Sequence, residues 1–326
     1  MTNQIKATVF IPVYNGEHDH LEETLSALYR QVTDFSWDVL ITDSGSTDDS
    51  VNIINRFAQK HNNLKLLHLK KEEYSHGGTR QMAAELSQGE IMVYLSQDAV
   101  PHNEQWLVEM VRPFAIHPDI VAVLGNQKPR HYCFPAMKYD ILAVFNEQGV
   151  ADALTFWQRL DTSQKGQYTK ESFYSDVCSA APRKFLIEKI GYRNVAYSED
   201  YEYGKDILDA GYIKVYNSKA IVEHSNDVRL SEYRHRIFDE AYNVRLNSGI
   251  TNKVSIFSVV KQVLRSSFED SMKIISDNDY TWKRKLYWLA INPLFHIEKW
   301  RGIRQANLVE LNQDTSRYSL EKKKGS

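Results

Sequence analysis

The sequence predicts an α/β fold, with a mainly parallel sheet flanked by helices and a helical region toward the C-terminal end. Short apolar runs alternate with helical patterns over about the first hundred residues, which is typical of right-handed βαβ units around a parallel sheet. From about Arg229 onward, apolar residues recur every three or four positions, which indicates helices. We therefore expect one domain over residues 1–228 and a helical appendage over residues 229–326.

The first strand–helix unit begins with Ala7–Tyr14, which is apolar almost throughout, as in strands buried on both faces. A helix is expected next, and Asp19 with Glu22 resembles a capping box at its start. The apolar positions of this helix that fall at helical spacing are Leu21, Leu25, Leu28 and Val32.

The second unit begins with a strand over Trp37–Thr42 and continues through the polar segment Asp43–Asp48. Ser46 or Thr47 can cap the helix that follows. The apolar face of that helix contains Val51, Ile54 and Ala58. A third strand is expected over Leu64–Leu69.

Later elements are shorter. We predict a polar loop over Glu72–Thr79, a short helix over Arg80–Leu86 and a fourth strand over Ile91–Leu95. Further along, Gly211–Val222 suggests two short strands divided at Asn217-Ser218, because such polar residues favour turns.

The helical region combines apolar and basic residues. Ten Lys and Arg face five Asp and Glu between residues 251 and 305, a local charge of +5, so the rest of the chain sums to −7. Pro293 should kink or end a helix. This region is interpreted as a packed appendage, an oligomer interface or a contact with a membrane surface, where Lys, Arg and Trp are favourable. The apolar residues that step by three and four are Phe257, Val260, Leu264, Phe268, Met272 and Ile275.

Composition excludes several classes of protein. Hydrophobic residues make up 42% and charged residues 25%, which argues against wholesale disorder. Forty Lys and Arg against 42 Asp and Glu give a net charge of −2, whereas nucleic-acid binders usually carry a basic excess. Mean hydropathy is −0.49, and no apolar run approaches the ~20 residues that cross a bilayer. The first 16 residues lack a basic start and a cleavage site, so they indicate a core strand rather than a signal peptide.

The two cysteines, Cys133 and Cys178, have no CxxC spacing. They predict buried free thiols rather than a disulfide framework or a zinc site, and they fit a reducing cytosol.

Polar residues follow the predicted strands where ligands bind in parallel sheets, beyond the carboxyl ends. Tyr14 and Asn15 follow the first strand, Asp43 the second and Asp98 the fourth. The turn after the first strand lacks the GxGxxG pattern of dinucleotide-binding enzymes, and there is no Walker A loop.

The remaining candidate is a nucleotide site with acidic groups and a metal. Asp43 can accept hydrogen bonds from a base or ribose, and Tyr14 offers a ring for stacking. Arg80 offers a planar fork for a base carbonyl or phosphate. Asp98 is a hard oxygen ligand for Mg²⁺ or Mn²⁺.

Several motifs together resemble inverting family 2 glycosyltransferases of GT-A fold, over about residues 6–245. They are Pro12-Val13-Tyr14-Asn15-Gly16, Asp43-Ser44-Gly45-Ser46-Thr47-Asp48, Ser96-Gln97-Asp98 and Ser198-Glu199-Asp200. More narrowly, the bacterial rhamnosyltransferase branch is similar at His76-Gly77-Gly78-Thr79-Arg80, Ser96-Gln97-Asp98-Ala99-Val100-Pro101 and Glu223-His224-Ser225.

The resemblance implies roles for particular residues. Asp200 would act as the general base, and Glu199 would lie on the acceptor side. Asp98 would bind Mg²⁺ or Mn²⁺ with His224 as a second ligand, although Ser96 stands at the first position of the DxD-type motif. The residues expected to bind the nucleotide or its sugar are Pro12, Tyr14, Asp43, His76, Gly78, Arg80 and Gln97.

The resemblance further implies inverting transfer of a sugar, L-rhamnose from dTDP-L-rhamnose, to a hydroxyl of a saccharide acceptor during bacterial surface polysaccharide synthesis. Such acceptors are often lipid-linked, which fits a cytoplasmic enzyme at the inner face of the plasma membrane. Two alternatives are kept: a family 2 transferase that uses a UDP-sugar, and a non-catalytic scaffold that binds a nucleotide sugar.

Several of these residues also have a purely structural interpretation. Asp43 can serve only as a turn or cap residue, since SGSTD is good capping chemistry. Glu199 and Asp200 can be a solvated helix start, where carboxylates suit the dipole. His76 and His224 can be purely structural histidines.

Overall fold

The computed structural model describes residues 5–195, 198–226, 228–248, 254–311 and 313–320. The chain divides into two compact units. The sheet unit comprises residues 1–128 and 143–224, and the helical unit comprises residues 129–142 and 225–326. The short segment 129–142 therefore belongs with the helices that follow residue 225, although it lies far from them in sequence.

The sheet unit is built around one mixed sheet of nine strands among the described residues. The strand order is β3-β2-β1-β4-β8-β6-β9-β5, and β7 pairs with the beginning of β9. The strands are β1 (Ala7–Val13), β2 (Trp37–Asp43), β3 (Leu64–His68), β4 (Ile91–Leu95), β5 (Val100–Pro101), β6 (Ile120–Lys128), β7 (Leu154–Gln158), β8 (Cys178–Pro182) and β9 (Ile213–Glu223).

Strand direction decides which chain segments can meet. Strands β1 to β4 are mutually parallel, β8 is antiparallel to both β4 and β6, and β6 is parallel to β9. Strands β6 and β9 therefore run in the same direction as β4. As a result, the carboxyl ends of β1, β2, β4, β6 and β9 lie along one edge of the sheet, together with the first residue of β8.

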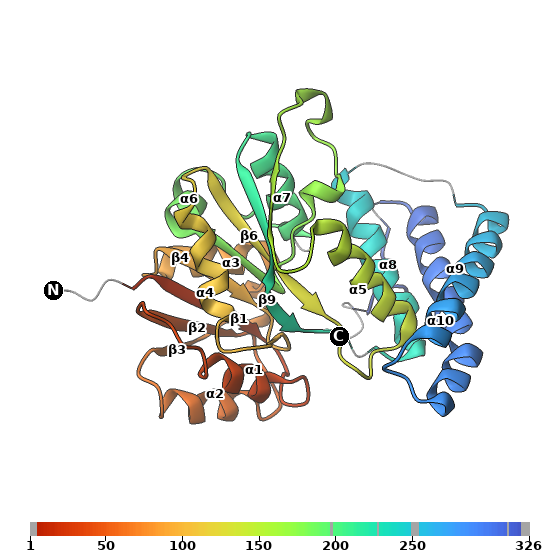
Figure 1. Cartoon of the computed structure of the whole chain (residues 1–326), viewed down its shortest axis with the longest axis horizontal. Helices are drawn as coiled ribbons and strands as arrows, with labels where there is room; N and C mark the ends of the chain where they lie inside the picture. Colours follow the sequence, from red (N-terminus) through yellow and green to blue (C-terminus); the bar gives the residue numbers. More distant parts are fainter. Residues whose placement is uncertain (1–4, 196–197, 227, 249–253, 312, 321–326) are drawn as a thin grey trace. The chain divides into compact units, whose positions relative to one another are not determined.

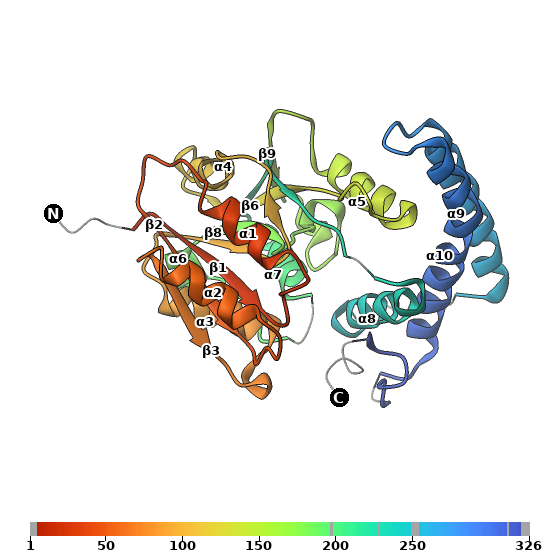
Figure 2. The same cartoon turned by 90° about the horizontal axis from the view of Figure 1, so that it is seen from below.

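Helices lie on both sides of this sheet. Figure 1 shows α1 and α2 on one side of the strands and α6 and α7 on the other, and Figure 2 looks onto α1 and α2 from below. The helices of the sheet unit are α1 (Leu21–Leu28), α2 (Ser50–Ala58), α3 (His76–Leu86), α4 (Trp106–Val111), α6 (Arg183–Glu188) and α7 (Glu199–Asp209). Helix α5 (Pro135–Gln148) begins in the helical unit and ends in the sheet unit.

The four strands predicted before residue 96 are confirmed: β1, β2 and β4 consist mostly of buried side chains, and β3, at the edge of the sheet, is only partly buried. Val9, Ile11 and Val93 have no exposed surface in the main core. Trp106 is also fully buried there, and its Nε1 donates a hydrogen bond to Cys178 Sγ over 3.3 Å. Both cysteines are free and buried, as the sequence predicts.

Helix starts differ from the predictions. Helix α1 begins after His20, which has left-handed backbone angles and forms no side-chain cap, so the predicted capping box is absent. Asp19 instead accepts a hydrogen bond from Gln97. Helix α1 ends at Leu28, and Val32 lies beyond it, 55% exposed.

The next two helices also begin elsewhere. Helix α2 begins after Asp49, and neither Ser46 nor Thr47 caps it, because Ser46 Oγ accepts from the Asn15 N–H instead. Helix α3 begins at His76, within the predicted loop, and Ser75 Oγ caps it by accepting from the Gly78 N–H.

Strand β9 is continuous, whereas the sequence suggested two strands. The register of its pairing with β6 shifts within the strand. Gly125 of β6 lies opposite Asn217, whereas the next residue of β6, Asn126, lies opposite Ile221. The residues between them form a bulge, so turn-like residues here extend a strand rather than end it.

The helical unit contains α8 (Leu230–Ser248), α9 (Ile256–Ser276) and α10 (Trp282–Leu308), with the first half of α5. Helix α10 packs against both α8 and α9. A Cβ atom added at Gly302 would lie 2.7 Å from the Arg234 carbonyl oxygen, so α8 and α10 approach closely there. Helix α10 continues through Pro293, so this proline does not end it. Across the described residues, no helix is both long and apolar enough to cross a membrane.

Candidate active site

Hydrogen bonds join the loops that follow β1, β2 and β4. The Tyr14 N–H donates to Gln97 Oε1 over 3.0 Å, and Gln97 Nε2 donates back to the Tyr14 carbonyl over 3.3 Å. The Ser44 N–H donates to the Val13 carbonyl. The tips of these three strands therefore form one connected surface. The Tyr14 ring is 38% exposed, with Lys71 Nζ 5.8 Å from its centre.

Asp43 ends β2 and is nearly buried, at 3% exposure. Its carboxylate accepts from the N–H groups of Gly45 and Ser46 over 3.2 Å, and His68 Nδ1 lies 3.5 Å away. These contacts hold the turn after β2, so the structural role of Asp43 is present in the molecule. The same contacts fix the carboxylate at the edge of the sheet.

Asp98 and His224 meet across this edge because β4 and β9 end there. The His224 Nε2 atom lies 3.2 Å from Asp98 Oδ2, and both side chains are largely buried. On the other side of the ring, Nδ1 lies 3.1 Å from Gln127 Oε1, near the end of β6. An amide oxygen can only accept, so the Nδ1–H of His224 donates to Gln127, and this bond orients the ring with Nε2 toward Asp98.

The same network leads to Asp200. Gln127 Nε2 donates to Ser175 Oγ over 3.2 Å, and the next residue, Asp176, donates its N–H to Asp200 Oδ2 over 3.3 Å. Asp200 Oδ1 accepts from the Tyr201 N–H over 2.8 Å. The acids at positions 98 and 200 are thus linked through His224, Gln127 and the adjacent residues Ser175 and Asp176.

Arg80 lies behind Asp200 in a buried cluster of charges. Its Nη1 is 2.5 Å from Glu199 Oε1, and its Nε is 2.9 Å from Asp176 Oδ2, an ion pair without hydrogen-bond alignment. Asp176 Oδ1 accepts from the hydroxyls of Ser179 and Tyr192. With 9% or less of each side chain exposed, Arg80 and Glu199 face protein rather than solvent.

Asp176 is the member of this cluster that the sequence analysis missed. It belongs to no recognised motif and follows no predicted strand. Its position is set by β8, because antiparallel β8 begins at the edge where its parallel neighbours end. An acid two residues before a short antiparallel strand could have been found only after the strand order was known.

The packed charges shift the pKa values of the acids. Burial raises the pKa of Asp200 well above its usual range, and the charges of Glu199 and Asp176 raise it further, while Arg80 lowers it. Burial also raises the pKa of Glu199 and of Asp176, and Arg80 opposes both shifts. A carboxylate with a raised pKa is a stronger base, which suits proton removal.

Two glycines lie at close approaches near the start of α3, and Gly77 allows the helix to pack against the loop that precedes α7. A Cβ atom added at Gly77 would lie 1.8 Å from the Arg193 carbonyl oxygen, and one at Gly78 would lie 2.6 Å from Ser75 Oγ. His76 lies beside Arg80, and burial together with the guanidinium lowers the pKa of His76 to about 4. The imidazole is therefore neutral near pH 7.

The structure thus brings Tyr14, Asp43, Gln97, Asp98, Asp200 and His224 to one edge of the sheet. Pro12 lies within β1, opposite Thr42. Gly78, Arg80 and Glu199 lie in the packing between α3 and α7. The roles assigned to these residues stay predictions.

The donor set is suited to a hard divalent cation. Among the described residues no group of three His, Cys, Asp or Glu side chains could hold a metal ion. Asp98 and His224 offer one carboxylate oxygen and one imidazole nitrogen at 3.2 Å from each other. Mg²⁺ is typically bound by one or two carboxylates together with substrate phosphates and water. The pair therefore fits a cation that receives most of its ligands from a diphosphate.

A family assignment follows from comparison with known proteins. The model of "Glycosyl transferase family 2" matches residues 8–191, and the chain belongs to this family. The chain is 26% identical over 237 residues to the O-antigen chain rhamnosyltransferase RfbN of Salmonella typhimurium, covering 72% of this chain and 71% of RfbN. It is 28% identical over 235 residues to the O-antigen chain rhamnosyltransferase WbaN of Salmonella anatum, covering 71% and 70%.

A solved structure shows the same fold. The mannosyltransferase PcManGT of Pyrobaculum calidifontis, solved in complex with GDP-Man and Mn²⁺, aligns with a TM-score of 0.57 at 17% identity. The alignment covers 94% of this chain and 86% of that chain. The predicted fold class, a GT-A glycosyltransferase fold with a helical C-terminal region, is confirmed.

Proposed function

We propose that this glycosyltransferase moves L-rhamnose from dTDP-L-rhamnose to a hydroxyl of a growing bacterial surface polysaccharide, with inversion at the anomeric carbon. The similarity to two O-antigen chain rhamnosyltransferases over about 70% of each chain supports this choice of sugar and acceptor. The observation that carries the chemistry is the convergence of Asp98, His224 and Asp200 on one edge of the sheet.

Inverting transfer is a single displacement at the anomeric carbon, so a base must take the acceptor proton as the hydroxyl attacks. We assign this role to Asp200, whose carboxylate is held by the N–H groups of Asp176 and Tyr201. The buried partners Glu199 and Asp176 keep its pKa high, and Arg80 fixes both of them in place.

The leaving nucleoside diphosphate gains negative charge, which must be neutralised. Asp98 and His224 would hold Mg²⁺ or Mn²⁺, and the cation would supply that neutralisation when bound. Gln127 and Gln97 orient the surrounding groups, the first by fixing the His224 ring and the second by joining Tyr14 to the loop after β4. Tyr14 and Asp43 would receive the nucleotide.

The donor class suggests where the enzyme acts. We infer a cytoplasmic location, because nucleotide sugars are the donors, and contact with the inner face of the plasma membrane, where a lipid-linked saccharide acceptor would be found. The Salmonella relatives, named for the O-antigen chain, support the class of acceptor.

The test of this function is donor turnover together with Asp200→Asn. The wild-type chain should release dTDP from dTDP-L-rhamnose in the presence of an acceptor extract, and the variant should lose at least ~100-fold in rate. Donor binding, measured by calorimetry, should be nearly unchanged. Asp209→Asn, at the far end of α7, is the matched control and should retain activity.

Other outcomes would replace the proposal. Release of UDP from a UDP-sugar, with no turnover of dTDP-L-rhamnose, would assign a different donor. Donor binding without turnover of any donor would indicate a non-catalytic scaffold. Full activity of Asp200→Asn would exclude this carboxylate as the base.

A further inference from the structure

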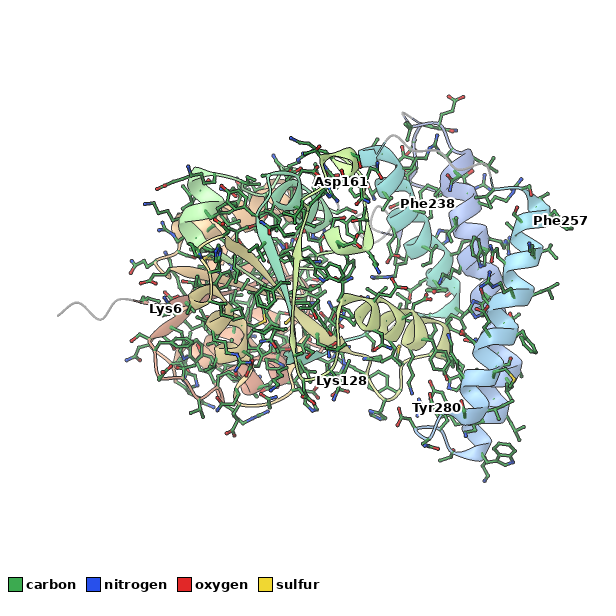
Figure 3. The ribbon with its side chains drawn as sticks, turned by 45° about the horizontal axis from the view of Figure 1, so that its top comes forward. Lys6, Lys128, Asp161, Phe238, Phe257 and Tyr280 are labelled. Carbon is green, nitrogen blue, oxygen red and sulfur yellow. The ribbon has the colours of Figure 1, made fainter. Side chains whose placement is uncertain are left out.

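Helix α9 carries an apolar stripe that the helical unit does not bury. The six residues that recur every three or four positions, with Ile256, are between 47% and 78% exposed, although such side chains are usually inside a protein. Figure 3 shows Phe257 on the outer side of α9, directed away from the neighbouring helix. The stripe comprises Ile256, Phe257, Val260, Leu264, Phe268, Met272 and Ile275.

Helix α10 extends this surface. The two helices run antiparallel, because Lys285 Nζ donates to the Ile275 carbonyl and His296 pairs with Asp270, further back along α9. An α-helix turns by about 100° per residue, which places the exposed stripe of each helix relative to the residues that contact the other helix. In this antiparallel arrangement both stripes fall on the same side of the helix pair. We call the combined surface the α9–α10 face. The exposed apolar residues that α10 contributes are Leu286, Tyr287, Leu294 and Ile297.

Basic residues accompany the apolar ones. Lys261 and Lys283 are exposed beside the stripes, and Lys285 Nζ lies 5.9 Å from the centre of the exposed Trp282 ring. The helical unit carries 20 Lys and Arg against 13 Asp and Glu, a net charge of +7. Since the whole chain carries −2, the sheet unit carries −9. The exposed apolar surface therefore belongs to the positively charged helical unit, whereas the sheet unit is negatively charged.

Charge decides which occupant fits. A second copy paired through this face by two-fold symmetry would bring two units of +7 together, because such a contact uses the same patch on both chains. A bilayer with anionic lipids offers an apolar layer beneath negative head groups, which complements apolar stripes bordered by Lys and Arg.

We propose that the α9–α10 face lies on the surface of an anionic membrane, with its apolar side chains in the head-group boundary and its lysines among the lipid phosphates. This surface contact agrees with the finding that no described helix is long and apolar enough to span a bilayer. The negative sheet unit would be repelled by the same surface, so the charge division favours approach through the helical unit. The proposal rests on the membrane contact inferred under the proposed function and names the residues that make this contact. Its test does not depend on sugar transfer.

The experiment measures co-sedimentation of the full chain with vesicles. One set contains phosphatidylcholine alone, and the other contains phosphatidylcholine with phosphatidylglycerol. Three exposed positions are changed together, Phe257→Ser, Leu264→Ser and Phe268→Ser. The matched control is Leu160→Ser in the sheet unit, where the side chain is 83% exposed. Circular dichroism checks that each variant folds.

The wild-type chain and the control should bind the phosphatidylglycerol vesicles and bind phosphatidylcholine alone much more weakly. The triple variant should lose at least ~10-fold in affinity, since binding scales with buried apolar area. Lys261→Gln and Lys283→Gln should each cost roughly fivefold, and added salt should weaken wild-type binding.

Three results would overturn the proposal. The first is absence of wild-type binding to anionic vesicles, and the second is equal binding by the triple variant. The third is self-association of the wild-type chain in sedimentation equilibrium that the triple variant abolishes, which would assign the face to a second copy. Loss of sugar transfer by Asp200→Asn would leave vesicle binding unchanged, so the two proposals fail separately.

Discussion

At the scale of single residues, Asp200 depends on its charged neighbours. Its carboxylate shares one cluster with Glu199, Asp176 and Arg80, and the two acids raise its pKa while the guanidinium lowers it. A base must be deprotonated, so the transfer rate should rise with pH through the pKa of Asp200. With Asp200 as the proposed base, we expect the cluster to set the acid limit of activity.

Glu199→Gln should move that limit to lower pH. The change removes one negative charge near Asp200 and leaves Arg80 in place, and both effects lower the pKa of Asp200. The measurement is the pH dependence of kcat/KM for the wild-type and variant enzymes. Glu171→Gln, an acid outside this cluster, serves as control and should leave the profile in place. An acid limb that stays or moves to higher pH would contradict the assignment.

A second prediction at the scale of single residues concerns the effect of Gly77 on folding stability. Gly77→Ala should lower the free energy of unfolding by ~1–3 kcal/mol or more, because the added methyl group would overlap the Arg193 carbonyl oxygen. Gly45→Ala is a useful contrast, since that site has open space and only a left-handed backbone, with a cost of ~1 kcal/mol. Urea denaturation compares the two. Equal costs would show that α3 and its neighbours can move apart.

At the scale of elements, the strand ends β4, β6 and β9 supply Asp98, Gln127 and His224 to one group. Asp98→Asn should weaken the Mn²⁺-dependent part of donor binding by ~10-fold or more, because a carboxylate binds hard cations better than an amide does. Calorimetry with and without a chelator measures that part. Asp49→Asn, an exposed acid in the loop after β2, is the control. Equal sensitivity to the chelator in wild-type and Asp98→Asn proteins would remove Asp98 from the metal site.

The helices and strands also show where sequence patterns are sufficient to predict local structure. Ile91–Leu95 and the other early strands were predictable, because buried parallel strands are continuous apolar runs. The start of α3 was not, since the glycines that let it pack beside Arg193 look like a loop. The bulge near Asn217 looks like a turn for a similar reason. In each case a contact distant in sequence decides the local structure.

The site follows the same division. Asp43, Asp98 and Asp200 could be named as candidates because they follow strands or begin a helix within recognisable motifs, and their roles stay predictions. The link from Asp98 to Asp200 through Gln127, Ser175 and Asp176 could not be predicted, because it depends on the direction of β8 and on the pairing of β6 with β9.

At the scale of the whole molecule, a truncation tests the division into two units. Removing residues 225–326 should give an insoluble protein, because Phe134 and Met137 pack against Tyr233 and Phe295 in the helical unit. Adding Phe134→Ser and Met137→Ser should restore solubility, because the two changes remove the exposed apolar patch. Size-exclusion chromatography of both truncated chains makes the comparison. Full solubility of the unmodified truncation would show that segment 129–142 does not need the later helices.

The interleaving of the two units has a consequence for how such chains can diversify. A recombination event that replaces everything after residue 225 exchanges most of the helical unit but retains the old segment 129–142. That segment must then fit a foreign surface where Phe134 stacks on Phe295 at 4.1 Å between ring centres. Successful exchanges therefore require compatible partners at two separate places in the gene, so we expect the sheet unit and the helical unit to be inherited together more often than a simple two-part layout would require.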